Sequence, residues 1–197
     1  MIQIKGLVKK YQSVTAVEQL DLEIPAGELF GFLGPNGAGK TTTIKLMVGL
    51  LKPTAGQILI DGINVLEDPV RAKSQVGYIP DRPFIYEKLT GLEYLEFVAD
   101  LYGVEQKAVR SRAEKYLDFF DLAASAHELV EGYSHGMKQK LLISSALIHD
   151  PRLVIVDEPL VGLDPKGARQ VKSLFQDLCR KGTTVFMSTH SMGIAET

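Results

Sequence analysis

The chain has 197 residues, a net charge of -2 and 45% hydrophobic residues, which is typical of a globular protein with an ordinary core. The near-neutral charge argues against general attraction to nucleic acid or anionic lipid, and the lone cysteine, Cys179, excludes a disulfide within this sequence. Since no apolar run approaches membrane-spanning length, we expect another chain to cross the membrane if the protein acts there.

The first 85 residues are predicted to be rich in β-structure. Alternation of apolar and polar residues, or a short continuous apolar run, marks each expected strand. We expect strands over residues 2–8, 20–24, 29–33, 57–60 and 76–79, and a helix over residues 41–48.

The hydrophobic period becomes helical after Gly91 and returns to strand-like after His149. We predict an α/β core over residues 1–85 and 150–197 and an inserted helical lobe over residues 86–149, all within one domain. In the second part of the core we expect a buried strand over residues 153–156, a helix over 168–180, a strand over 183–187 and the start of another helix at 191.

The most informative segment joins the third predicted strand to the first predicted helix. It reads Gly-Pro-Asn-Gly-Ala-Gly-Lys-Thr and matches the phosphate-binding pattern G-x-x-x-x-G-K-[ST]. Glycines allow close approach of the backbone to phosphate oxygens, and the helix start adds free N–H groups. A plain glycine-rich turn is disfavoured by the flanking strand and helix. The predicted nucleotide-binding residues are Gly34, Pro35, Asn36, Gly37, Ala38, Gly39, Lys40, Thr41 and Thr42, with Lys40 on the β- and γ-phosphates and Thr41 on Mg²⁺.

Two carboxylates follow the buried strand over residues 153–156 directly. Phosphoryl-transfer enzymes need a carboxylate at such a strand end to hold Mg²⁺, and a second one to polarise the attacking water. Asp157 and Glu158 fit these two roles in adjacent positions. The two acids could instead form a solvated turn, and the phosphate loop makes that interpretation the weaker one.

A third segment, Tyr133-Ser134-His135-Gly136-Met137, resembles the signature of ATP-binding cassette (ABC) ATPases, usually written L-S-G-G-Q. The order of phosphate loop, signature, acidic strand, Gly162-Leu163-Asp164 and His190 is similar to the complete motif set of that family, over essentially the whole chain. The resemblance implies an α/β fold of the P-loop NTPase type: a RecA-like core, an N-terminal antiparallel β portion and an inserted α-helical subdomain.

The family resemblance also implies roles for single residues. Tyr11 lies where the family stacks an aromatic ring on adenine, and His190 where it has a histidine that contacts the γ-phosphate and helps to fix the attacking water. Glu158 would be the general base, and Asp157 would assist Mg²⁺.

The signature would serve a second subunit. Ser134 and Gly136 would bind the γ-phosphate of ATP held by the opposite subunit, and Asp164 belongs to the loop that crosses the interface. The resemblance thus implies a head-to-tail dimer, expected to be a homodimer, in which ATP joins the two chains and hydrolysis releases them.

The sequence departs from the family pattern at three places. Asp81 stands where the family has a glutamine that contacts Mg²⁺ or the attacking water, so we expect an altered metal dependence. His135 and Met137 replace a glycine and the glutamine of the signature, and we expect a changed rate rather than lost function. The family usually continues well past the histidine, so we expect that the chain ending at Thr197 is truncated.

The resemblance therefore predicts an ATPase subunit of an ABC transporter that uses ATP and Mg²⁺ and drives a separate membrane permease from the cytoplasmic face. The segment over residues 81–91 and the helical lobe are expected to face the permease. The signature and the earlier segment over residues 89–95, Leu-Thr-Gly-Leu-Glu-Tyr-Leu, look most like ABC-2-type exporters, and an importer is the nearest competing assignment. Two further possibilities are a soluble ABC ATPase that acts on ribosomes or DNA and an ATP-binding regulator that does not hydrolyse. No nucleic-acid partner is expected.

Overall fold

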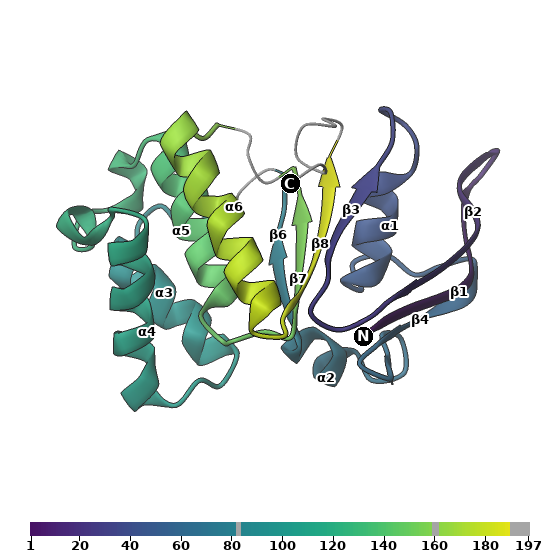
Figure 1. Ribbon diagram of the computed structural model, residues 1–197, viewed down its shortest axis with the longest axis horizontal. Helices are drawn as coiled ribbons and strands as arrows, with labels where there is room; N and C mark the ends of the chain where they lie inside the picture. Colours follow the sequence, from purple (N-terminus) through teal and green to yellow (C-terminus); the bar gives the residue numbers. More distant parts are fainter. Residues whose placement is uncertain (82–83, 159–161, 190–197) are drawn as a thin grey trace.

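The structure, a computed structural model, describes residues 1–81, 84–158 and 162–189. It contains two four-stranded sheets joined side by side, with a lobe of helices beyond the second sheet (Figure 1). The first sheet is antiparallel, in the order β2-β1-β4-β5, and the second is parallel, in the order β3-β8-β7-β6. This architecture is the α/β fold that the sequence predicts.

The antiparallel sheet is longer than the sequence pattern predicts. Its strands are β1 (Ile2–Tyr11), β2 (Val14–Ile24), β4 (Ala55–Ile60) and β5 (Ile63–Asn64). Strand β1 continues past the predicted end at Val8 because a two-residue turn returns the chain directly into β2, pairing Tyr11 with Val14. Gln12 in this turn has a φ of 47°, in the left-handed region that tight hairpins require.

The parallel sheet brings four strand ends to one edge. Its strands are β3 (Leu29–Leu33), β6 (Val76–Ile79), β7 (Leu153–Asp157) and β8 (Thr184–Thr189). The register pairs Leu33 with Thr189, Asp157 with Ser188, and Ile79 with Val156. Because all four strands run the same way, the loops that leave their carboxyl ends converge there, the usual ligand edge of such a sheet.

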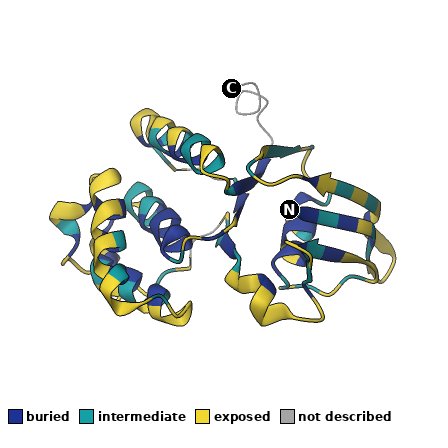
Figure 2. Cartoon of the chain, turned by 60° about the horizontal axis from the view of Figure 1, so that its bottom comes forward, coloured by how far each residue is buried: buried dark blue, intermediate teal, exposed yellow. Residues whose placement is uncertain are grey.

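Strands β7 and β8 separate two hydrophobic cores. Leu153 and Ile155 pack into the core shared with the antiparallel sheet, whereas Val154 and Val156 pack into the core of the helical lobe. All five residues of β7 are buried, so its sequence is a continuous apolar run rather than an alternating one. Figure 2 shows the buried strands between the two halves of the molecule.

Six α-helices complete the described fold, and capping residues mark the start of most of them. Thr90 and Glu93 form a capping box, and Asp68, Ser134 and Asp164 each cap a helix through the side chain. None of the described helices is long and apolar enough to cross a membrane. The helices are α1 (Lys40–Met47), α2 (Pro69–Ser74), α3 (Gly91–Leu101), α4 (Gln106–Phe119), α5 (His135–Leu147) and α6 (Pro165–Arg180).

A stacked pair of rings joins the helical lobe to the core. Tyr102, at the end of α3, stacks on His149, which lies between α5 and β7, with ring centroids 3.7 Å apart and planes within 10°. Both ring nitrogens of His149 are buried. Burial lowers the pKa of His149 from 6.5 to about 4, with a smaller contribution from Arg112, while the Val76 backbone and Asp150 oppose this shift.

This low pKa predicts a loss of stability in mild acid. The unfolded chain binds the His149 proton below pH 6.5, whereas the folded chain binds it only near pH 4. The contribution of neutral His149 to the free energy of unfolding is therefore fully present above pH 6.5 and is lost as the pH falls toward 4. Allowing for partial exposure, we expect about 1 kcal/mol to be lost between pH 7 and pH 5. Urea unfolding of the unaltered chain and of His149→Phe at both pH values measures this, with His127→Phe, at an exposed histidine, as the control. An equal pH dependence in the unaltered chain and His149→Phe would contradict the assignment.

Candidate nucleotide-binding site

The loop between β3 and α1 holds a lysine at its centre. Lys40 is only 8% exposed, and its Nζ donates hydrogen bonds to the carbonyl oxygens of Gly34 (2.6 Å) and Pro35 (3.0 Å). The loop therefore fixes a positive charge beside its own backbone, at the start of a helix that has no side-chain cap. Uncapped N–H groups and an ammonium are the groups that an anion-binding loop requires, so the geometry is compatible with the predicted role.

Gly39 occupies a position in this loop that leaves no room for a side chain. Its φ of 84° lies in the left-handed region, and a methyl group built on it would lie 2.3 Å from the carbonyl oxygen of Ala16. The residue both reverses the chain into α1 and lets the loop approach strand β2. A larger residue would have to push the loop and strand β2 apart.

A cleft of about 440 Å³ opens at this loop and reaches the ends of the parallel strands. Its polar lining combines the cationic loop with acidic residues from two other strand ends, which lie far apart in the sequence. The lining residues are Val14, Thr15, Ala16, Asn36, Gly37, Gly39, Lys40, Thr41, Thr42, Asp81, Asp157 and Glu158. The structure thus places six of the nine predicted phosphate-loop residues and the three predicted acidic residues in one cleft.

The two acidic residues after β7 have different surroundings. Asp157 is 3% exposed and accepts a hydrogen bond from the hydroxyl of Ser188, on β8. Glu158 is partly exposed and has a φ of 56°, which is unusual for a residue with a side chain. Such strained backbone occurs often at functional sites, where it aims a side chain that regular strand geometry would direct elsewhere.

Asp81 brings a third carboxylate to the cleft, after the end of β6. The pKa of the Tyr78 hydroxyl, on β6, is raised to about 12, chiefly by burial. The negative charges of Asp157 and then Asp81 raise it further. The described residues alone contain no cluster of three or more acidic, His or Cys side chains that could hold a metal ion. The hydroxyl and carboxylate oxygens of Thr41, Asp157 and Asp81 still fit Mg²⁺, which usually binds one or two carboxylates together with substrate phosphates.

Six of the predicted residues lie outside the lining of the cleft. Three of them, Gly34, Pro35 and Ala38, belong to the phosphate loop itself, and the other three come from elsewhere in the chain. Tyr11 is 42% exposed and pairs across the hairpin with Val14, which does line it; the Lys9 ammonium lies 4.9 Å from the centre of the Tyr11 ring. Ser134 and Gly136 lie at the start of α5, where the Ser134 hydroxyl accepts a hydrogen bond from the Met137 N–H. The predicted residue His190 lies outside the described residues.

Sequence reasoning missed four residues of this site. Val14, Thr15 and Ala16 line the cleft although no motif marks them, because they reach it through the register of the β1–β2 hairpin. Ser188 was missed because its bond to Asp157 depends on the pairing of β7 with β8. No local pattern in the sequence identifies any of the four, since each reaches the site through strand pairing.

Known proteins are similar to this chain in sequence and in fold. Residues 17–161 match the ABC transporter family model. Over its full length the chain is 40% identical to the bacitracin transport ATP-binding protein BcrA of Enterococcus faecalis, and 35% identical to the probable multidrug ABC transporter ATP-binding protein YbhF of Escherichia coli. It covers 63% of the first relative and 34% of the second, so it spans less than two thirds of their length.

Two solved structures confirm the fold class. An ATP-binding subunit of an ABC transporter has a TM-score of 0.94 and 34% identity, with 100% of this chain and 82% of that chain covered. The dimeric cassette MJ0796 in a post-hydrolysis state, bound to ADP and Pi, has a TM-score of 0.89 and 26% identity, with 99% and 90% covered. Together with the family match and the phosphate loop facing the acidic strand end, they establish that this chain belongs to the ABC transporter family.

Proposed function

We propose that this chain binds and hydrolyses MgATP and that the energy drives a separate membrane permease. The observation that carries this proposal is the single cleft that joins the Lys40 loop to Asp157 and Glu158. Lys40 and the start of α1 would hold the β- and γ-phosphates, and Glu158 would accept a proton from the attacking water. Thr41 and Asp157, with Asp81, would hold Mg²⁺, which neutralises phosphate charge when bound.

A second subunit would complete each site. Ser134 and Gly136 do not line the cleft that holds the phosphate loop of their own chain, which supports a role toward the ATP of a partner. The start of α5 offers N–H groups and the Ser134 hydroxyl, which can still donate a hydrogen bond. The likeness to MJ0796, whose solved structure is dimeric, supports the same arrangement. We propose a homodimer on the cytoplasmic face of the membrane.

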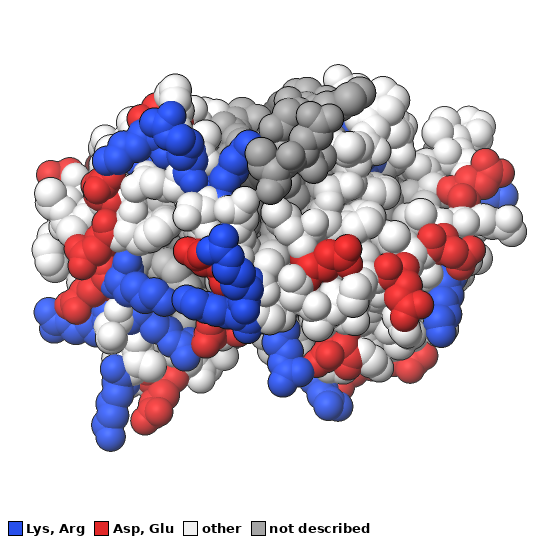
Figure 3. Space-filling model, in the orientation of Figure 1, with Lys and Arg blue, Asp and Glu red and all other residues white. Residues whose placement is uncertain are grey.

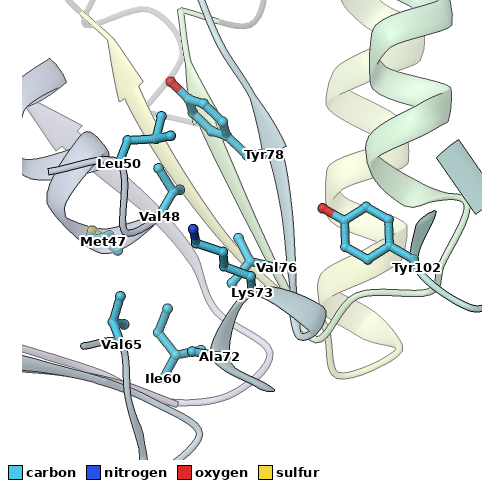
Figure 4. Close-up of a pocket in the computed structure, with 10 residues that line it drawn as sticks. All are labelled: Met47, Val48, Leu50, Ile60, Val65, Ala72, Lys73, Val76, Tyr78 and Tyr102. Carbon is cyan, nitrogen blue, oxygen red and sulfur yellow. The ribbon is translucent and has the colours of Figure 1, made fainter. Parts of the chain in front are cut away.

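A groove of about 160 Å³ supports the proposed permease contact (Figure 4). Tyr102 comes from the end of α3, whereas Leu50, Lys73 and Tyr78 come from the core, so the groove lies where the lobe meets the core. On the helical lobe, Phe84 is 81% exposed and begins an edge-to-face series of rings through Tyr86 to Phe97 on α3. Exposed aromatic residues in such a series are typical of a protein contact.

The names of relatives support export as the direction of transport. They concern bacitracin transport, linearmycin resistance and a probable multidrug transporter. A ribosome- or DNA-directed role is less well supported. On the face drawn in Figure 3, Lys and Arg side chains over the helical lobe are interspersed with Asp and Glu, rather than gathered in one basic stripe.

Asp81 is proposed to act on the metal from the position of the usual glutamine. We expect Asp81→Ala to raise the Mg²⁺ concentration needed for half-maximal ATP hydrolysis by about tenfold, the typical loss when a group that supports a metal is removed. Magnesium titrations of ATPase activity measure this, with Asp100→Ala, at an exposed residue of α3, as the control. Unchanged activity and unchanged Mg²⁺ dependence in Asp81→Ala would remove Asp81 from the site.

The transporter assignment is tested by capture from membranes. The tagged chain is expressed in its host, recovered from gently solubilised membranes with MgATP, and the bound proteins are identified by mass spectrometry. We expect one multi-spanning membrane protein in stoichiometric amount, lost in Phe84→Ala and kept in Phe119→Ala, at an exposed aromatic residue on α4. Ribosomes or nucleic acid in place of that protein would favour the soluble ABC ATPase instead.

A further inference from the structure

His135, which stands where the family signature has a glycine, packs directly against Gly162. A methyl group built on Gly162 would lie 2.0 Å from Cδ2 and 2.3 Å from Nε2 of His135, closer than real carbon contacts allow. The imidazole of His135 therefore occupies the place that any side chain at position 162 would need. Gly162 also has a φ of 81°, which favours glycine on its own account.

The contact between His135 and Gly162 belongs to a longer packed seam. A methyl group on Gly136 would lie 3.3 Å from the carbonyl oxygen of Gly162, so the two backbones are also close. One turn further along α5, Cε of Lys140 lies 3.3 Å from the position of a methyl group on Gly167, whose N–H donates to Asp164 at 2.9 Å. The start of α5 thus packs on the loop at 162–164 and on the first turn of α6.

The seam connects two parts of the proposed reaction. His135 directly follows Ser134, the signature residue proposed to bind a partner's ATP, and Gly162 follows Glu158, the proposed base, by four residues. A shift of the imidazole would therefore move the start of α5 relative to residues 162–164. Neither His135 nor Gly162 lines the cleft of its own chain.

We propose that His135 is a positioning residue that packs against Gly162 and holds the start of α5, which is proposed to bind a partner's phosphate, in place against residues 162–164. The inference rests on the proposed function. The substitution of glycine by histidine in the signature is accommodated because residue 162 has no side chain. The effects of the two positions are therefore coupled. A side chain at 162 displaces the imidazole, and this displacement lowers kcat for ATP hydrolysis but leaves the affinity of the single subunit for ATP unchanged.

A double-mutant cycle tests the pair, because it removes the effect that each substitution has alone. The variants are His135→Gly, Gly162→Ala and the double substitution. The strain of alanine at a φ of 81° is present with and without His135, so it cancels in the cycle. We measure kcat for ATP hydrolysis, ATP affinity at a concentration where the chain is monomeric, and the imidazole Cδ2 resonance of His135 by NMR.

We expect Gly162→Ala to lower kcat at least tenfold in the unaltered chain and less than threefold in His135→Gly, with ATP affinity of the monomer unchanged and the His135 resonance shifted. Equal losses in both backgrounds, or an unmoved resonance, would overturn the pairing. A loss of ATP affinity in Gly162→Ala would also overturn it, because the effect would then act through the subunit's own cleft. If the unaltered chain binds ATP but does not hydrolyse it, the proposed function is wrong, and the inference about His135, which rests on it, is wrong as well.

Discussion

Glu158→Gln is expected to lower kcat for ATP hydrolysis by at least about 100-fold while ATP binding is retained. A positioned general base contributes about 10²–10⁴ to the rate, and the amide of glutamine has nearly the same size but cannot accept the proton from water. Glu158 lines the cleft beside Asp157, and its backbone is held at a φ of 56°, so the substitution leaves the shape of the site intact. Phosphate release under steady-state conditions and ATP binding by calorimetry give the two quantities.

The loss of turnover in Glu158→Gln has a structural consequence in the proposed dimer. If ATP joins two subunits and hydrolysis separates them, the variant accumulates as a dimer in the presence of MgATP, which light scattering detects. Glu18→Gln, the same substitution at an exposed position of β2 outside the lining of the cleft, is the matched control and is expected to behave like the unaltered chain. Full turnover in Glu158→Gln would refute the catalytic assignment.

Lys40→Met is expected to weaken ATP binding by about 100-fold. The methionine keeps the apolar stem but loses the charge. The ammonium has one N–H donor beyond the two on the loop carbonyls; a hydrogen bond to a charged group contributes about 1.5–3 kcal/mol, and the lost attraction between the ammonium and the phosphates adds to it, which together correspond to about a 100-fold change in Kd. The ammonium also bonds the carbonyl oxygens of Gly34 and Pro35, which the substitution leaves without that donor. Calorimetric titration with ATP measures the affinity.

A matched substitution on the same helix separates the charge from the fold. Lys45→Met, at an exposed position in the last turn of α1, removes an equal charge outside the cleft and is expected to bind ATP normally. Thermal unfolding of both variants shows whether the phosphate loop still folds. A Kd for Lys40→Met within threefold of that for Lys45→Met would mean that Lys40 does not hold the phosphates.

Much of the parallel sheet could be predicted because its signals are local. The glycine loop lies between an apolar run and a helix, and the continuous apolar run before Asp157 identifies a strand buried on both faces. Helix α6 begins at Pro165 rather than at the predicted Ala168, although the Asp164-Pro165 pair is itself a helix-start signal. The short helix α2 was not predicted, since six residues give too little periodicity.

The rest of the site depends on contacts between distant segments. Ser188 reaches Asp157 only through the pairing of β7 and β8, and Ala16 touches the phosphate loop only because Gly39 leaves room. The groove near Tyr78 and Tyr102 lies where two halves of the chain meet, so no single segment contains it. The pairing of β7 with β8 joins segments that are separated by a whole helix, so the residues of either strand alone do not specify it.

The order of strands in the parallel sheet also constrains how the protein is made. Strand β3, which leads into the phosphate loop, pairs in the described sheet only with β8, and β8 in turn pairs with β7, which leads to Asp157. The strand that joins the two is thus the last of the described strands to be synthesised. While the ribosome is still making the residues before Thr184, a nascent chain holds the lysine and the carboxylates on parts not yet joined by a strand. Until β8 inserts between them, β3 and β7 each present an unpaired strand edge, the kind of edge on which incompletely folded chains associate.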